Sequence, residues 1–270
     1  MTIILFHGLG SSNKVLNYIY NDKKYNKNDF IKLLHKIDTV LIPEIPYTNV
    51  YHYSEYKIMK PMYEPIDYLN YDDLSLDKYI TNFYKSIDKT KYKAPYILIG
   101  HSHGIYFACE FAKQFKNKVK CIISLDGSWI TKEMNKQRLD TWKSKGKIIP
   151  KINNQTVLDD IIYKIKNEKD NDKYIKMIFD YVRGMHTKFC IKQKYELLDI
   201  PFITFRDFNS DVKNDVIMKQ FNDNVLKENQ ILSKYSNHLI YVLLDATHDL
   251  WSRPDYKNTI IKTIKLIIKN

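Results

Sequence analysis

The segment GHSHG, from Gly100 to Gly104, contains the residue types that nucleophilic catalysis by a serine requires. A serine hydroxyl becomes a strong nucleophile only when a neighbouring base accepts its proton and backbone N–H groups stabilise the oxyanion that follows. Ser102 lies between these two glycines, directly after the apolar run 96–99 and before a helical segment. Glycines at these places remove the Cβ atoms that would prevent a sharp strand-to-helix turn. The spacing therefore predicts that Ser102 is the nucleophile of an acyl-transfer reaction.

The base that would serve Ser102 is His248, in the segment DATHDLW that follows the apolar run 239–244. Catalytic groups of open α/β sheets collect beyond the carboxyl ends of the strands, and His248 has this position. The other histidines considered for this role lie before the nucleophile, in a predicted insertion or ahead of the last strand (His35, His52, His186 and His238). We therefore expect His248 to be the general base.

Three aspartates could orient the imidazole of His248 and fix its tautomer. Asp207 and Asp211 follow one apolar run, and Asp126 follows the run before it, where an aspartate is more often structural and bonds loop amides. Asp207 could still belong to its strand, where the pleat fixes the direction of its side chain. The Asn-Ser pair before Asp211 favours a turn toward the histidine loop. Asp211 is the expected acid, with Asp207 and then Asp126 as alternatives.

The oxyanion donors are expected from two turns. The segment HGLGSS, which begins at His7, follows the apolar run 3–6. The loop after an early strand supplies one donor in enzymes with a G-x-S-x-G turn, and we assign this donor to the Leu9 N–H. The second donor is the His103 N–H, at the start of the helix after Ser102, where the helix dipole favours negative charge. His7 is expected to support its loop rather than to act as a base.

These groups need a scaffold that brings the ends of several strands together, and an alternation of short apolar runs with helical segments predicts one. The runs are residues 3–6, 39–42, 96–99, 119–125, 202–205 and 239–244. Apolar residues at i, i+3, i+4 and i+7 predict helices over residues 75–88, 104–117, 213–235 and 255–268. The expected fold class is α/β, with a six-stranded, mostly parallel sheet in the order 2-1-3-4-5-6 and helices on both faces.

Two segments fall outside this alternation. Residues 43–74 are rich in Tyr and Pro and are expected to form a long ordered loop near the carboxyl edge of the sheet. Residues 127–200 are longer than a crossover between parallel strands requires and are expected to form an inserted helical cap. Aromatic residues of this cap could line an apolar acyl pocket or form its core (Trp129, Trp142, Phe179 and Tyr181). We expect residues 1–270 to form one domain with this insertion.

Composition limits the partners and the compartment. The formal net charge is +12, but the lysines are scattered beside acidic residues, which predicts a solvated surface and no specific nucleic-acid partner. The three cysteines have no CxxC spacing, so buried thiols are expected rather than a disulfide framework or a zinc site. The sequence has no secretory signal pattern and no apolar run of transmembrane length. A cytoplasmic protein is therefore expected.

HGLGSS, GHSHG, the aspartate loop after residue 205 and the terminal THD segment occur in this order along the chain. With these motifs the chain resembles the α/β-hydrolase superfamily over nearly its whole length. Its abundance of Lys, Asn, Ile and Tyr resembles that of an AT-rich microbe or a large DNA virus. The sequence departs from the superfamily pattern in two ways: it starts at the strand before HGLGSS, without the antiparallel strand pair of many members, and it lacks a glycine before the acid.

The resemblance implies hydrolysis of a carboxylic ester or a similar acyl compound through an acyl-enzyme on Ser102, with no metal and no organic cofactor. In the superfamily the acid usually lies a few residues beyond its strand, which favours Asp211 over Asp207. Lipases, thioesterases, carboxylesterases and some peptidases share this turn, so the resemblance does not specify the small acyl substrate. The alternative from another class is a non-catalytic small-molecule-binding protein that retains the fold.

Overall fold

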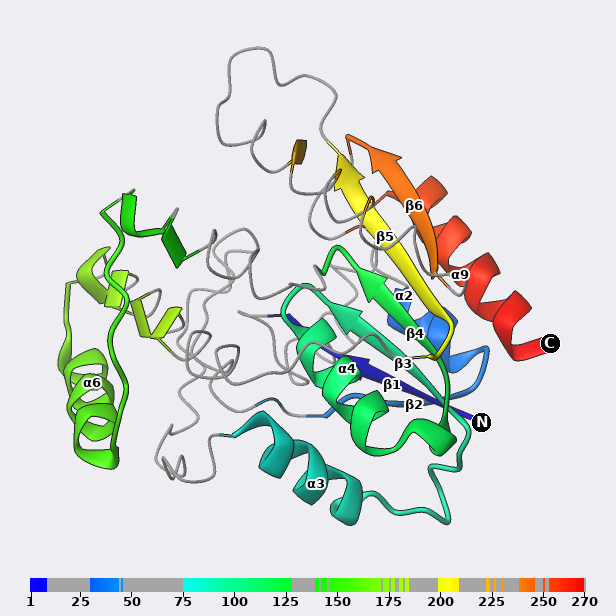
Figure 1. Cartoon of the computed structure of the whole chain (residues 1–270), viewed down its shortest axis with the longest axis horizontal. Coiled ribbons are helices and arrows are strands. Elements are labelled where there is room, and N and C mark those ends of the chain that lie inside the picture. The colour runs from blue at the N-terminus through cyan, green and yellow to red at the C-terminus, as the bar shows by residue number, and fades with distance from the viewer. Residues whose placement is uncertain are drawn as a thin grey trace.

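The fold is taken from a computed structural model of the chain. It describes residues 1–8, 30–43, 45, 75–127, 139–140, 142–144, 146–170, 172–174, 176–177, 180–181, 183–184, 199–208, 222–223, 226, 230, 238–245, 250 and 253–269. Within these residues, strands and helices alternate around a single twisted sheet (Figure 1).

The sheet has six strands in the described part of the chain, in the order β2-β1-β3-β4-β5-β6. The strands are β1 (Thr2–Phe6), β2 (Thr39–Leu41), β3 (Tyr96–His101), β4 (Val119–Leu125), β5 (Phe202–Phe208) and β6 (His238–Leu244). Every neighbouring pair is parallel. The strand order predicted from the sequence is therefore confirmed, and so is the α/β fold class.

The last two strands are longer than the apolar runs that predicted them. β5 continues through Arg206 and Asp207 to Phe208, and β6 begins at His238. The two strands pair along their whole length, with Asp207 opposite Leu243. The ladder hydrogen bonds continue past the apolar residues, because backbone pairing does not depend on side-chain polarity. Asp207 is therefore part of a strand, and His238 opens its strand instead of preceding it.

Helices cover both faces of the sheet, as the sequence predicts. α3 (Leu76–Ser86) and α4 (Gly104–Gln114) pack on one face, and α2 (Phe30–His35) and α9 (Pro254–Lys269) pack on the other (Figure 1). Alternate residues of each strand point to opposite faces, which separates the apolar core into two layers. The first layer includes Ile4, Phe6, Leu98, Phe107, Phe111 and Ile122. The second includes Ile3, Leu5, Ile97, Ile99, Phe205 and Ile260.

The helix boundaries differ from the predicted ones in detail. α4 ends at Gln114, and a 3₁₀ turn, η5 (Lys116–Lys118), leads into β4. α2 has no counterpart among the predicted helices, because a helix this short shows too little periodicity to be recognised. The predicted helix over residues 213–235 and the predicted loop over residues 43–74 lie almost wholly outside the described residues.

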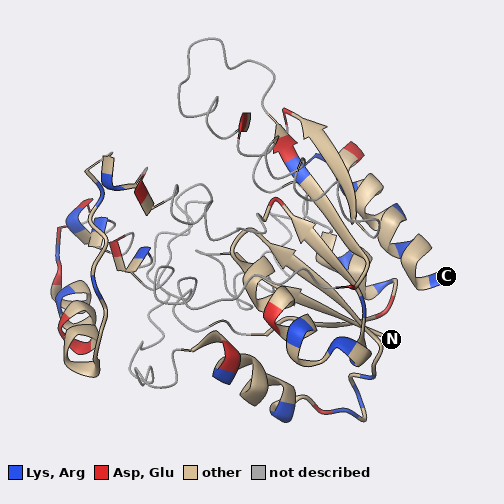
Figure 2. Cartoon of the chain, in the orientation of Figure 1, with Lys and Arg blue, Asp and Glu red and all other residues tan. Residues whose placement is uncertain are grey.

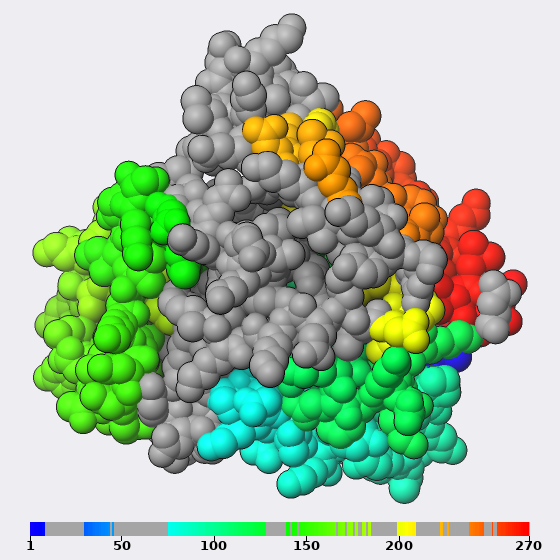
Figure 3. All heavy atoms as spheres, in the orientation of Figure 1, coloured from blue at the N-terminus to red at the C-terminus, as the bar shows by residue number. Residues whose placement is uncertain are grey.

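The segment predicted to form a cap contains α6 (Gln155–Asn167). Its N-terminus is capped by Asn154, whose side-chain oxygen accepts a hydrogen bond from the Val157 N–H at 2.9 Å. In Figure 1 α6 lies to one side of the sheet, and in the space-filling view it forms the flank opposite β6 and α9 (Figure 3). Its buried residues, Leu158, Ile162 and Ile165, belong to the same apolar cluster as Ile4 and Phe6. The cap insertion and its bounds at residues 127–200 stay a prediction.

Figure 2 shows both signs of charge on α3, α4 and α6, whereas in α9 a single acidic residue, Asp255, is followed by four lysines (Lys257, Lys262, Lys265 and Lys269). The solvated surface expected from the sequence stays a prediction. No helix in the described ranges is long and apolar enough to span a membrane. Of the cysteines, Cys121 is buried, Cys109 is partly buried, and both are free thiols, while Cys190 lies outside the described residues.

Candidate active site

Ser102 lies on a sharp turn between β3 and α4. It is the first residue after the strand and has a φ of 51°, in the left-handed region that few non-glycine residues adopt. Its N–H donates to the Leu125 carbonyl of β4 at 2.9 Å, and α4 begins two residues later at Gly104. Backbone conformations of this kind concentrate at functional sites, where the surrounding structure maintains them. The strand-to-helix turn predicted for Ser102 is therefore present.

Glycines are required on both sides of Ser102. A Cβ atom at Gly100 would lie 2.5 Å from the Cα of Ile105, in the first turn of α4. A Cβ atom at Gly104 would lie 2.1 Å from the backbone oxygen of Phe6, at the end of β1. Real Cβ atoms do not approach backbone atoms this closely. The G-x-S-x-G spacing thus reflects close packing of the turn against its own helix and against the neighbouring strand.

The turn after β1 approaches Ser102 at a third glycine. A Cβ atom at Gly8 would lie 3.0 Å from the Ser102 Cβ and 3.1 Å from Nδ1 of His101. The start of the HGLGSS segment therefore packs directly against the serine turn. Leu9, the expected oxyanion donor of this segment, lies outside the described residues.

His7 is buried beneath this turn, with 1% of its surface exposed. Its Nδ1 lies 3.2 Å from the Gly8 carbonyl, and its Nε2 accepts from the Ile45 N–H at 3.4 Å. These partners fit a neutral ring with the proton on Nδ1. The pKa of His7 is lowered from 6.5 to about 4, chiefly by burial and in smaller part by the nearby His101, and this value already includes the raising effect of the Gly8 and Pro43 carbonyls. His7 therefore supports its loop, as predicted.

The two histidines that flank Ser102 are also buried. The His103 ring packs against Tyr106 and Phe107, with ring centroids 5.0 and 5.9 Å apart. His103 is the N-cap residue of α4, so its backbone lies at the positive end of the helix dipole. This is the position expected of the second oxyanion donor.

Asp126 follows β4 and is held by a buried ion pair. Its Oδ1 accepts from Nη1 of Arg206 at 3.2 Å and from the Asp207 N–H at 3.3 Å. The Arg206 and Asp126 side chains are only 3% and 2% exposed. The contact to a backbone amide is the structural role that the sequence suggested for an aspartate at this place. The sequence analysis missed Arg206 as the partner of this carboxylate.

The other members of the expected triad are incompletely described. Asp207 lies within β5, next to the Asp126 carboxylate, whereas Asp211 and His248 lie outside the described residues. The loop that contains His248 leaves the sheet at Asp245, directly after β6. All six strands are parallel, so this loop starts at the same edge of the sheet as Ser102.

Three strands end at this edge in the same way. The residues that follow β3, β4 and β6 are Ser102, Asp126 and Asp245, with φ values of 51°, 48° and 53°. Each donates its N–H to a neighbouring strand at 2.8 to 2.9 Å, and the acceptors are the carbonyls of Leu125, Phe205 and Phe208. The ladder therefore extends one residue past each strand before the chain turns sharply out of the sheet.

No group of His, Cys, Asp and Glu residues in the described ranges could hold a metal ion.

No family model and no curated protein matches the chain. Solved structures do match it. NosK from Streptomyces actuosus is 11% identical, with a TM-score of 0.51, over 99% of this chain and 97% of that one. The RedJ thioesterase of prodiginine biosynthesis in Streptomyces coelicolor is 10% identical, with a TM-score of 0.50, over 99% and 90%. An α/β-hydrolase enzyme from the sediment metagenome of the Mar Chica lagoon in Morocco is 16% identical, with a TM-score of 0.48, over 98% and 90%.

The strand order, the glycine-flanked serine turn and the likeness to NosK and to the RedJ thioesterase together define the fold class of the chain: it has the α/β-hydrolase fold. At this level of identity the likeness concerns the fold alone. The fold implied by the sequence resemblance is thus confirmed.

The packing at Gly104 predicts that Gly104→Ala is far more destabilising than a matched change at Gly146. Gly146 has a φ of +64°, but nothing lies within 4 Å of the Cβ position there, whereas Gly104 faces a backbone oxygen at 2.1 Å. We expect Gly104→Ala to lose about 3 kcal/mol or to prevent folding, and Gly146→Ala to lose about 1 kcal/mol. Urea unfolding of both variants measures this, and equal losses would contradict the packing argument.

Burial of His7 predicts that the fold loses stability as the pH falls from 6.5 to 4. A histidine with a folded pKa near 4 and an ordinary value of 6.5 takes up its proton more readily in the unfolded state, so its contribution is complete above pH 6.5 and declines toward pH 4. The loss from His7 is about 3 kcal/mol at pH 4. His7→Gln should show a shallower decline than the wild type in urea unfolding between pH 7.5 and 4. Identical slopes would rule out this role.

Proposed function

We propose that the protein is a serine hydrolase that cleaves a carboxylic ester or a similar acyl compound through an acyl-enzyme on Ser102. The observation that carries the proposal is the left-handed φ of 51° at Ser102, on a turn between β3 and α4. Such a turn raises a hydroxyl above the edge of the sheet and directs a helix N-terminus toward it. A serine in an ordinary loop needs neither the strained conformation nor the two close glycine contacts.

In the proposed reaction, His248 accepts the Ser102 proton while Oγ attacks the acyl carbon. The negative charge that develops on the acyl oxygen is stabilised by the backbone N–H groups of Leu9 and His103. His248 then donates its proton to the leaving alcohol and afterwards activates a water molecule, which releases the acid and regenerates Ser102. The start of α4 beside Ser102 and the approach of Gly8 to its Cβ at 3.0 Å support this assignment of the donors.

We propose Asp211 as the acid, with Asp207 as the alternative. Asp211 lies three residues beyond Phe208, where β5 ends, and the acid of the resembled superfamily usually lies a few residues past its strand. The direction of Asp207 is fixed by pairing within β5. Asp126 is the weakest candidate, because its carboxylate is committed to Arg206 in a buried pair.

The substrate is proposed to be a small acyl or ester compound. Tyr181 in the predicted cap is fully buried within the apolar core, which supports a packing role for this residue, while Trp142 is only partly buried. Trp129 and Phe179 lie outside the described residues. The free thiols Cys109 and Cys121 fit a reducing compartment, and we propose a cytoplasmic location.

A fluorophosphonate probe should label the wild type at Ser102 in a one-to-one ratio, since a base makes this one hydroxyl far more nucleophilic than the others. Ser102→Ala should abolish labelling and reduce kcat for p-nitrophenyl acetate by about 10⁴-fold or more. Ser86→Ala is the matched control, because the Ser86 hydroxyl is exposed and donates only to the Phe83 carbonyl, at 2.8 Å.

Intact-mass spectrometry measures labelling by the probe, and p-nitrophenyl acetate hydrolysis measures turnover. A wild type that neither reacts with the probe nor hydrolyses esters would favour the non-catalytic binding protein. Labelling that persists in Ser102→Ala would show that another residue is the nucleophile.

Neutral variants of the three aspartates should separate the acid from the structural carboxylate. Asp211→Asn should lower kcat/KM by about 10⁴-fold, because the imidazole loses the correct tautomer. Asp207→Asn should lower kcat/KM less than tenfold. Asp126→Asn should mainly lower the melting temperature, because it leaves Arg206 buried without its counter-charge. A folded Asp211→Asn protein with near-normal kcat/KM would transfer the role to Asp207.

A further inference from the structure

Arginine is scarce in this chain, and its positions are informative. Only four of the 43 basic residues are arginines, and three of them lie in the described ranges: Arg183, Arg206 and Arg253. Each of these three forms an ion pair with an aspartate. In a chain that uses lysine at most basic positions, an arginine is expected where the planar guanidinium, with its several donors, is needed. Arg253 borders the loop proposed to contain the base.

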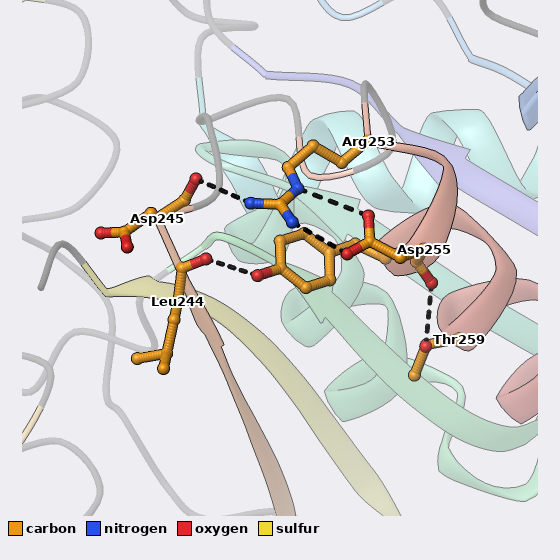
Figure 4. A network of polar contacts seen from close by, with 6 residues as sticks. Leu244, Asp245, Arg253, Asp255 and Thr259 are labelled. Carbon is orange, nitrogen blue, oxygen red and sulfur yellow. Dashed lines mark hydrogen bonds and ion pairs between the residues drawn. The ribbon is translucent and has the colours of Figure 1, made fainter.

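Arg253 connects the first turn of α9 to the end of β6 (Figure 4). Its Nη2 donates to Asp255 Oδ2 at 2.9 Å, its Nε lies 3.4 Å from Oδ1 of the same carboxylate, and its Nη1 lies 3.4 Å from the Asp245 carbonyl. The guanidinium also lies over the Tyr256 ring, 4.3 Å from its centroid. One side chain thus joins the residue that follows β6 to two residues of the helix.

Tyr256 provides a second connection between the same elements. Its hydroxyl donates to the Leu244 carbonyl, the last one of β6. Asp255 belongs to the first turn of α9, where its backbone carbonyl accepts from Thr259 Oγ1 at 3.0 Å (Figure 4). The carbonyls at the end of β6, on Leu244 and Asp245, are therefore both bonded to the start of α9.

The loop between these elements is also anchored in the core. Leu250 is fully buried and belongs to the same apolar layer as Ile260 and Ile261 of α9. His248 is separated from Leu250 by one residue and from Asp245 by two. The segment that contains His248 is short, and described contacts hold it on both sides.

We propose that Arg253 is a positioning residue: with Tyr256, it joins the end of β6 to the start of α9, and by fixing these two ends of the segment between Asp245 and Arg253 it supports His248 as the base for Ser102. This inference rests on the proposed function. Arg253 itself touches neither the substrate nor the reacting atoms.

The exposure of the network separates this role from ordinary stabilisation. Arg253 and Asp255 are 43% and 56% exposed, and exposed ion pairs contribute little to the stability of a fold. A displacement of a catalytic group by about 1 Å, in contrast, can lower the rate by roughly 100-fold. Loss of Arg253 should therefore lower activity strongly and the melting temperature hardly at all.

The experiment compares the wild type with Arg253→Ala, Arg253→Lys and Tyr256→Phe, measuring p-nitrophenyl acetate hydrolysis, melting temperature and amide hydrogen exchange over residues 245–253. Arg253→Ala should lower kcat by about 10- to 100-fold, leave KM within about twofold and speed exchange in this loop alone. Arg253→Lys should be intermediate, because an ammonium over the Tyr256 ring cannot bond both the Asp245 carbonyl and the Asp255 carboxylate.

Tyr256→Phe tests the same connection without a change of charge. Like Arg253→Ala, it should lower kcat. It should also shift the acidic limb of the pH–rate profile to lower pH, because an imidazole that lies farther from its carboxylate loses stabilisation of its charged form.

Lys89→Ala is the matched control. The Lys89 ammonium lies over the Tyr84 ring at 4.6 Å and donates to the Tyr84 carbonyl at 3.0 Å, but it precedes β3, at the opposite edge of the sheet. This variant should keep wild-type kcat, pH profile and loop exchange.

Unchanged kcat and unchanged loop exchange in Arg253→Ala would overturn the inference. So would an activity loss that follows a fall of more than about 5 °C in melting temperature, with faster exchange throughout the sheet. A wild type that hydrolyses no ester would instead refute the proposed function. In that case loop exchange in Arg253→Ala still decides whether Arg253 holds the loop.

Discussion

The close contact between the serine turn and the end of β1 is the constraint on which the rest of the site depends. Gly104 lies so near the Phe6 carbonyl that a single additional carbon atom would come within 2.1 Å of it. This contact fixes where α4 starts, and α4 in turn covers the sheet with Phe107 and Phe111. Because β1 and β3 are adjacent and parallel, the HGLGSS segment emerges beside Ser102. Ser102, the proposed nucleophile, and Gly8, which begins the turn after β1, thus share one packing arrangement.

The arrangement of the strands was predictable from the sequence, because buried parallel strands form short, nearly continuous apolar runs that lack the periodicity of helices. The serine turn was predictable for a different reason: two glycines around a polar residue are costly unless the backbone needs them. The ends of the strands were less predictable. Arg206 and Asp207 interrupt the apolar run of β5, yet the ladder with β6 continues through them. Pairing depends on backbone groups that a residue pattern does not reveal.

The polar contacts between distant segments were the least predictable part. Asp126 and Arg206 lie 80 residues apart, and no local pattern in the sequence joins them. The connection from Arg253 and Tyr256 to the end of β6 likewise depends on how α9 folds back along the sheet. The scarcity of arginine was the one available signal for both, since a planar guanidinium directs several bonds in a fixed geometry, whereas an ammonium is a point charge with rotatable donors.

The hydrogen bonds at the carboxyl edge also set the order in which the edge can be completed as the chain is synthesised. The turn at Ser102 needs the Leu125 carbonyl, and the turn at Asp126 needs the Phe205 carbonyl, so each requires a strand that leaves the ribosome later. β1 is made first, but it pairs with β3 only after most of the first hundred residues exist. Such distant pairings form slowly. The apolar strands β1 and β3 are therefore synthesised before any of this edge can be completed.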